Sequence, residues 1–296
     1  MTRENAAANA AAGVAAILFG ASVVAVRIAV REVPPLTLAL LRFGQGSLVL
    51  LVALVAFRRD LLRVDHRDLP YLALLGAIFF ALFPVAFNLG MRSVDASHGA
   101  LLLATMPLWT LIISRVVARD PLSGQQVIGV LTSLAGVAIV MADRSTATTG
   151  SGSSAFGNAL LILTAICGAT YNVLAKRMLG KYAGLTVTFY AMVIGTLLLA
   201  PAPFIENVPD TNALAAETVA MVVFLGLFGG AIGFSLWTSA LRRLSPTQVA
   251  VYINLNPISA TLLAAAMLHE HLSGVFLIGF LAVAAGVMIV NWTRAQ

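Results

Sequence analysis

Ten long apolar runs, separated by short polar or proline-containing connections, dominate the chain. A helix needs about 20 apolar residues to cross roughly 30 Å of hydrocarbon, and each run is long enough. The runs cover about residues 10–31, 36–57, 70–91, 96–117, 124–142, 156–177, 184–203, 217–240, 246–268 and 273–292. The pattern predicts an all-α integral membrane protein with ten transmembrane helices.

The second half of the chain repeats the first at an offset of 150 residues. Residues 91–141 align on residues 241–291 without a gap. The matched pairs include Arg92 with Arg242, Pro107 with Pro257, Gly129 with Gly279, and Gly136 with Gly286. A Gly/Ser/Thr linker over residues 144–154 leaves five runs on each side. We therefore expect one five-helix repeat over residues 1–143 and a second over residues 155–296.

The amino-acid composition indicates that lipid, not water, surrounds most of this chain. Hydrophobic residues are 60% of it, charged residues only 10%, and the mean hydropathy is +0.96. A soluble domain has roughly 45–50% apolar and about 25% charged residues. The net charge of +6 does not indicate nucleic acid, because the basic residues sit at the ends of apolar runs and form no single patch.

The basic residues predict the orientation of the runs. Thirteen of the 18 fall on the side of the two termini, four on the other side, and Arg42 lies within a run. This bias places both termini in the cytoplasm, with the chain in a bacterial-type inner (plasma) membrane. An odd number of helices per repeat inverts the second repeat relative to the first. Inverted repeats can exchange inward-open and outward-open shapes about a central site.

Several segments carry a resemblance to a known family. They are Phe19-Gly20-Ala21-Ser22 in the first run, Leu41-Arg42-Phe43 in the second, the paired mid-run prolines, and Leu268-His269-Glu270-His271-Leu272-Ser273. With ten spans in two repeats, the chain resembles the drug/metabolite transporter superfamily, most closely its EamA-type branch. Within that branch it is most similar to bacterial exporters of aromatic and other neutral amino acids. The resemblance implies export of small neutral or zwitterionic metabolites by alternating access.

Two prolines mark the expected centre of the transport path. Pro107 and Pro257 fall near the middle of the fourth and ninth runs, at equivalent repeat positions. A mid-helix proline kinks the helix and frees a backbone carbonyl. In a membrane this is tolerated where the freed group faces protein or a water-filled cavity. The paired breaks predict hinges around a midplane cavity, with a simple packing kink as the alternative.

Polar and aromatic residues near the middle of the runs are the candidate lining of this cavity. Aromatic walls could stack on an aromatic side chain or hold an ammonium, and amides could bind polar groups. The candidates are Ser22, Phe83, Phe87, Asn88, His98, Thr105, Trp109, Tyr171, Asn172, Trp237, Tyr252 and Asn256. For each, packing between helices or against lipid is the alternative. Unpaired amides are costly in hydrocarbon, which favours a binding role for Asn256.

Arg42 is the one cation well inside a run. An ionisable group at membrane depth indicates function. We expect Arg42 to form a structural or gating pair with Asp95 at the outer mouth of the path, with contact to substrate as the alternative.

The acidic residues limit the mechanism. No Asp or Glu lies deep in a run, and carriers coupled to protons or sodium generally need a buried carboxylate. We therefore expect a facilitator or exchanger. The alternatives are export of other metabolites or drugs, a carrier of the nucleotide-sugar or sugar-phosphate type, and proton coupling. Phosphorylated solutes would need several deep Lys or Arg residues, whereas only Arg42 is available.

An enzyme is not expected. The sequence places no nucleophile–base pair at membrane depth, and His269-Glu270-His271 lacks the i, i+4 spacing of a helical zinc site. We expect no cofactor and no metal. The expected partners are a small-molecule substrate and membrane lipid, and a monomer is compatible with this organisation.

Overall fold

The computed structural model describes residues 3–91, 93–94, 96–119, 121, 123–142, 154–206, 214–259, 262 and 274–292. Every regular element within these residues is helical, which confirms the all-α prediction. Nine helices in them are long and apolar enough to cross a membrane. The spans are Glu4–Val26, Pro35–Phe57, His66–Met91, Gly99–Ala118, Gly124–Met141, Ala155–Leu179, Gly184–Ile205, Ala216–Arg243 and Gly274–Asn291. The expected run 246–268 lies partly outside the described residues.

Several spans are built from more than one helical element. The elements of the first half are α1 (Arg3–Ala29), α2 (Pro35–Phe57), η1 (Arg59–Leu62), η2 (His66–Asp68), α3 (Leu69–Gly76), η3 (Ala77–Leu82), α4 (Phe83–Met91), α5 (Ala96–Leu103), α6 (Met106–Ile113), η4 (Ser114–Ala118) and α7 (Gly124–Ala142). Those of the second half are α8 (Ala155–Leu179), α9 (Gly184–Leu199), α10 (Ala202–Ile205), α11 (Ala216–Phe224), η7 (Leu225–Ile232), α12 (Gly233–Arg243), α13 (Pro246–Ala250), η8 (Val251–Asn254) and α15 (Gly274–Asn291).

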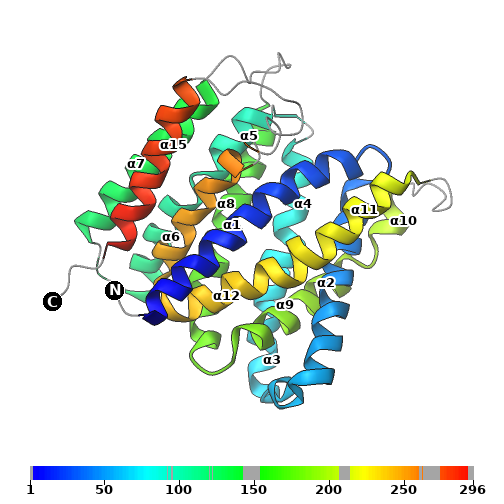
Figure 1. Cartoon of the computed structure of the whole chain (residues 1–296). Helices are drawn as coiled ribbons and strands as arrows, with labels where there is room; N and C mark the ends of the chain where they lie inside the picture. Colours follow the sequence, from blue (N-terminus) through cyan, green and yellow to red (C-terminus); the bar gives the residue numbers. More distant parts are fainter. Residues whose placement is uncertain are drawn as a thin grey trace.

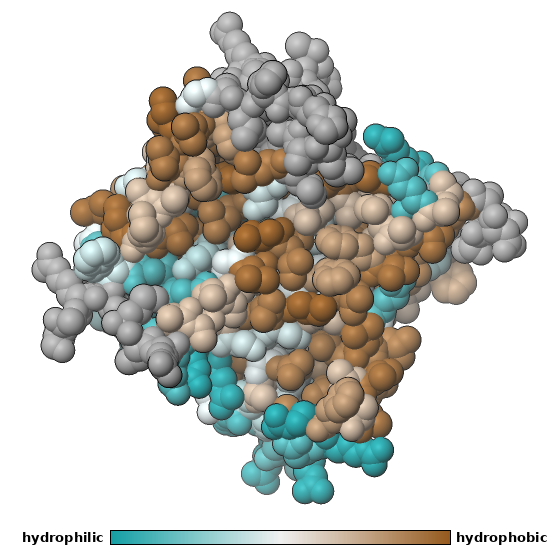
Figure 2. Space-filling model, viewed as in Figure 1, coloured by the Kyte–Doolittle hydropathy of each residue, from teal (hydrophilic) through white to brown (hydrophobic). Residues whose placement is uncertain are grey.

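The helices form one bundle whose outer surface is apolar. Figure 1 shows α1 beside α12, and α7 beside α15 at one edge. On the face in Figure 2, hydrophobic residues cover the middle, and hydrophilic residues gather below α2 and α3. Large apolar side chains such as Leu48, Val52 and Met288 are exposed on the helices. Such a surface suits hydrocarbon, because exposed apolar side chains need no hydrogen-bond partners and the backbone groups of a helix pair mostly within it.

Contacts between helix ends hold the bundle at its N-terminal end, which contains Glu4 and Arg243. Arg243 pairs with Glu4. Lys181 Nζ lies 3.0 Å from the Asp68 carboxylate, and the Tyr182 hydroxyl donates to Asp68 at 2.7 Å. This hydrogen bond raises the pKa of Tyr182. The contacts join α1 to α12, and the loop after α8 to the start of α3.

Lys176 makes a further contact at this end. Its Nζ donates to the backbone carbonyls of Leu241 at 2.7 Å, Arg242 at 3.1 Å and Leu244 at 2.6 Å. These carbonyls belong to the last turn of α12 and to its C-cap residue Leu244, where a helix leaves acceptors unsatisfied and carries partial negative charge. Lys176 therefore ties the end of α8 to the end of α12.

We expect Lys176→Met to lower the free energy of unfolding by about 1–3 kcal/mol, because charged hydrogen bonds to the three carbonyls are lost. Thermal unfolding in detergent measures this. Lys181→Met is the matched control, since it removes an exposed pair with Asp68, which should contribute roughly 1 kcal/mol or less. Equal effects of the two substitutions would contradict the capping role of Lys176.

Candidate functional site

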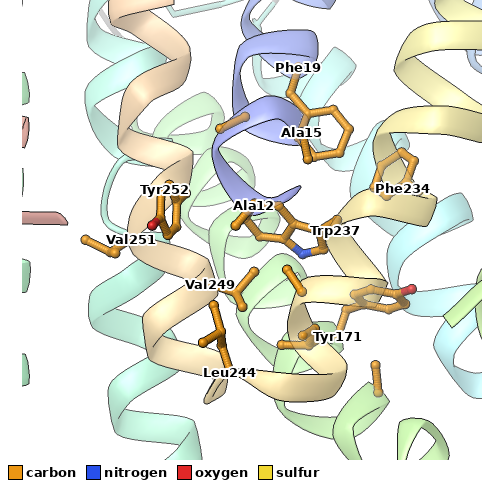
Figure 3. Packing of buried hydrophobic residues seen from close by; sticks show 14 of the residues in the cluster. Ala12, Ala15, Phe19, Tyr171, Phe234, Trp237, Leu244, Val249, Val251 and Tyr252 are labelled. Carbon is orange, nitrogen blue, oxygen red and sulfur yellow. The ribbon is translucent and has the colours of Figure 1, made fainter. Parts of the chain in front are cut away.

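A cluster of aromatic rings fills the centre of the bundle. Its members come from five elements: Phe19 of α1, Phe43 of α2, Phe79 and Phe80 of η3, Tyr171 of α8, and Phe234 and Trp237 of α12. Ring centroids lie 4.5 Å apart for Phe79 and Tyr171, and 5.3 Å apart for Phe79 and Phe234. In Figure 3 the rings from α1, α12 and α8 lie close to one another. We call this set the aromatic cluster.

One polar pair lies within the aromatic cluster. Trp237 Nε1 donates to Asn172 Oδ1 at 2.9 Å, and both residues are buried. The Asn172 Nδ2 amide and the Tyr171 hydroxyl are buried and have no hydrogen-bond partner among the residues that the structure describes. Leaving such groups unpaired in an apolar interior costs free energy. They are therefore the groups of the cluster that a polar ligand would satisfy.

The fourth span is broken at its proline. Helix α5 ends at Leu103, a turn covers Ala104 and Thr105, and α6 begins at Met106 with Pro107 in its first turn. The Thr105 hydroxyl donates to the Leu102 carbonyl at 2.5 Å. A proline ring clashes with the carbonyl four residues earlier. For Pro107 that residue is Leu103, which explains why the break precedes the proline.

The segment around Pro257 is broken in the same manner. Helix α13 ends at Ala250, and the 3-10 turn η8 follows before the chain becomes α-helical again at 255–259. The carbonyl four residues before Pro257 is that of Ile253, which lies in η8. Both interruptions therefore fall at the position that the proline disfavours.

Each break packs closely against a glycine of another helix. A Cβ placed on Gly20 of α1 would lie 2.9 Å from the Asn256 carbonyl, and one placed on Gly168 of α8 would lie 2.5 Å from Met106 Cε. The side-chain oxygen of Asn256 is buried without a hydrogen-bond partner among the described residues, so this break also carries an open acceptor.

The other candidates lie around this centre. Phe83 and Trp109 pack against Met106 and the small residues of α8, and Phe87 stacks on Phe83 with centroids 6.4 Å apart. Tyr252 donates to Asn9 Oδ1 at 3.0 Å, which ties it to α1.

Asn88 lies away from the aromatic cluster. Its Nδ2 donates to the Pro35 carbonyl at 3.0 Å, at the end of the bundle opposite the N-terminus. Asn88 and Tyr252 therefore connect helices in this structure.

Ser22 and Arg42 meet at η7. Arg42 Nη2 donates to the Gly229 carbonyl at 3.1 Å, and its guanidinium carbon lies 5.4 Å from the centre of the Phe43 ring. Ser22 is buried and donates to the Leu18 carbonyl at 2.8 Å. Asp95, the expected partner of Arg42, and the side chain of His98 lie outside the described residues.

Five members of the aromatic cluster were not among the candidates predicted from the sequence: Phe19, Phe43, Phe79, Phe80 and Phe234. Two of them adjoin residues that were singled out, since Phe19 precedes Gly20 and Phe43 follows Arg42. No comparable signal marks Phe79 or Phe234. Among the residues that the structure describes, no group of three His, Cys, Asp or Glu side chains gathers to hold a metal ion.

Comparison with known proteins places this architecture in a family. The model of the EamA-like transporter family matches residues 7–142 and 155–292. An "Uncharacterized transporter" of Archaeoglobus fulgidus is 27% identical, over 95% of this chain and 96% of the relative. The "Probable terminal-alkyne amino-acid exporter" of Streptantibioticus cattleyicolor is 31% identical, over 86% of this chain and 83% of the relative. One solved crystal structure shares the fold, with a TM-score of 0.78, 21% identity and 94% of both chains covered. The chain therefore belongs to the EamA-like transporter family and is a multi-pass membrane transporter, not an enzyme.

Proposed function

We propose that this transporter exports small neutral or zwitterionic metabolites, with aromatic and other neutral amino acids as the first candidates. The observation that carries the proposal is the Asn172–Trp237 pair inside a shell of aromatic rings. The Asn172 amide nitrogen and the Tyr171 hydroxyl beside it find no hydrogen-bond partner in the described part of the chain. The name of the Streptantibioticus cattleyicolor relative, a probable amino-acid exporter, points to the same class of solute.

The chemistry of these groups suits an amino acid. The aromatic rings can stack on an apolar or aromatic side chain, or attract an ammonium through their faces. The Tyr171 hydroxyl can donate or accept, and the open Asn256 oxygen accepts a hydrogen bond from an ammonium. Asn172 Nδ2 donates to a carbonyl or carboxylate oxygen. A solute with both donors and acceptors would satisfy groups that are unpaired in its absence.

Alternating access between inverted repeats is part of this proposal. Gly129 of α7 approaches the Gly286 carbonyl of α15, and Gly136 approaches that of Gly279. Gly279 is the repeat partner of Gly129, and Gly136 is the repeat partner of Gly286. Replacing both members of the first contact by their repeat partners therefore gives the second contact. A twofold relation between antiparallel helices would produce this pattern, and it supports two repeats related by an axis in the membrane plane.

Contacts at the two ends of the bundle support the same relation. Tyr182 Oη accepts from the Asp65 amide at 3.2 Å at the N-terminal end, and Glu32 accepts from the Ala215 amide at 2.9 Å. Residues 32 and 182, like 65 and 215, differ by the repeat offset of 150. Equivalent contacts at opposite ends are what alternate closure requires. With both termini cytoplasmic in an inner membrane, the N-terminal end would face the cytoplasm.

Uptake into proteoliposomes tests the proposed function. The purified protein is reconstituted with internal tryptophan, phenylalanine, methionine or threonine, and exchange against the radiolabelled solute is followed with and without a pH gradient. Liposomes that contain the same solute but no protein are the control. We expect exchange that reaches equilibrium, does not concentrate the solute and is indifferent to pH. Exchange of none of the four would overturn the substrate class, and gradient-driven accumulation would overturn the uncoupled mechanism.

We expect Pro107→Ala and Pro257→Ala each to slow exchange by about tenfold or more while the folded protein is retained. Alanine restores helical hydrogen bonding and removes the clash that keeps the spans broken, so straightening should impair cycling more than stability. Exchange rates and thermal unfolding are measured on the same preparation. Pro70→Ala is the matched control, because Pro70 lies in the first turn of α3, where proline interrupts nothing. Normal exchange by both variants would mean that the breaks only serve packing.

A further inference from the structure

Arg42 is a cation inside a membrane span. It lies about two turns into α2, and its side chain is half-buried. Two contacts hold the guanidinium: Nη2 donates to the Gly229 carbonyl, and the Phe43 ring faces it. The Nε–H is buried and has no hydrogen-bond partner among the described residues. Within that part of the chain, Nη2 is the guanidinium nitrogen that donates to a protein acceptor, so the side chain is anchored while other N–H donors stay open.

No carboxylate of the described residues lies within 4.0 Å of Arg42. The ion pairs among the described residues involve Arg58, His66, Lys181 and Arg243, all at the N-terminal end of the bundle. A cation at membrane depth is costly unless an anion or several acceptors compensate it. One carbonyl and one ring provide only part of that compensation, so the site favours an anionic ligand.

The residues around Arg42 leave room for its side chain. Gly229 lies in η7, a π-helical segment, and such segments are frequent at functional sites. A Cβ at Gly229 would lie 3.1 Å from Arg42 Nη2 and would collide with the Ser22 hydroxyl. Three elements, α1, α2 and η7, therefore converge here. Ser22 gives its proton to the Leu18 carbonyl and keeps its lone pairs for another donor.

We propose that Arg42 recognises the carboxylate of the transported solute. The guanidinium presents its open N–H groups to the two carboxylate oxygens, in the paired geometry that distinguishes arginine from lysine. The contact with Gly229 and the ring of Phe43 hold the fork in place. This inference rests on the proposed function and narrows it, because only solutes that carry a carboxylate would bind with full affinity.

The sequence-based alternative is an ion pair between Arg42 and Asp95, acting as a structural or gating contact. The two assignments differ in what the solute must supply. A protein carboxylate that neutralises Arg42 would remove the need for a carboxylate on the solute, whereas recognition by Arg42 makes that carboxylate necessary. Comparison of an amino acid with its amide separates them, since the amide replaces the carboxylate with a neutral carboxamide of similar size and keeps the same side chain.

The test is equilibrium binding of tryptophan and tryptophanamide to the purified full-length protein, measured by calorimetry. We expect wild type to bind the acid about 10–100-fold more tightly than the amide. Arg42→Gln should weaken binding of the acid until the two affinities agree within about threefold. Arg42→Lys keeps the charge but loses the fork, and we expect an intermediate preference. Arg63→Gln, at an exposed position, is the matched control and should keep the wild-type preference.

Three results would overturn the inference: equal affinities of wild type for acid and amide, an unchanged preference in Arg42→Gln, or loss of the preference in Asp95→Asn as complete as in Arg42→Gln. The wild-type comparison stands by itself if Arg42→Gln does not fold. Failure of the proposed function gives a different result, because wild type would then bind neither tryptophan nor its amide, nor the corresponding pairs made from phenylalanine and threonine.

Discussion

A single methyl group added at Gly286 is expected to lower the unfolding temperature of the protein by roughly 5–10 °C, which corresponds to about 2–3 kcal/mol of overpacking. The Cβ of Gly286→Ala would lie 2.5 Å from the Ser133 amide nitrogen and 2.6 Å from the Gly129 carbonyl oxygen. Both are backbone atoms of α7, which cannot rotate away. The two helices must therefore separate along the contact that joins them.

Helix propensity sharpens this prediction. Glycine to alanine normally stabilises a helix interior by about 0.5–1 kcal/mol, so a loss at Gly286 can only come from packing. Gly274→Ala on the same helix is the control, because no described residue has an atom within 4 Å of its Cβ position. Thermal unfolding in detergent measures both. We also expect Gly136→Ala to be destabilising and not additive with Gly286→Ala, since both separate α7 from α15. A Gly286→Ala variant as stable as Gly274→Ala would contradict the close contact.

The membrane architecture could be predicted from the sequence because its cause is local. Each span is a run of apolar residues whose backbone must bond within the helix, whatever its neighbours do. The repeat alignment likewise paired Gly129 with Gly279 and Gly136 with Gly286. Their role was not predicted, because the contact between α7 and α15 depends on which helices become neighbours.

The candidate site was predictable only where a residue type has a strong local effect. Pro107 and Pro257 mark broken segments, because the chemistry of proline dictates the break. Phe79 and Phe80 precede Phe83 by four and three residues, which puts all three on one side of an ideal α-helix. The sequence does not show which neighbouring helices that side meets, nor that the third span contains the π-helical segment η3. A π-turn shifts the side chains that follow it. The hydrogen bond between Asn172 and Trp237 needs the tertiary structure, since the two residues are far apart in sequence.

The double substitution Asn172→Leu/Trp237→Phe is expected to abolish transport and leave the fold intact. Replacing both partners of a buried hydrogen bond with apolar groups strands neither of them, whereas removing one partner strands the other. The smaller ring of phenylalanine leaves a cavity at Trp237 that should cost about 1–2 kcal/mol. The substitution also removes the open Asn172 amide, so its unsatisfied burial no longer costs free energy. If these groups bind the solute, exchange should fall by about 100-fold or more while the protein stays folded.

Thr188→Val/Thr238→Val is the matched control. These two hydroxyls are also buried and lie 2.8 Å apart, and Thr238 follows Trp237 on the same helix. Both double variants remove one hydrogen bond between buried side chains, and the threonine pair also loses its hydroxyl bonds to the Phe234 and Ser235 carbonyls of α12. Both proteins should stay folded, but only the first should lose exchange. Equal loss of exchange in both would mean that transport merely needs an undisturbed α12. Normal exchange in Asn172→Leu/Trp237→Phe would contradict the proposed solute class. The protein would then transport the solute without the polar groups that we propose bind it.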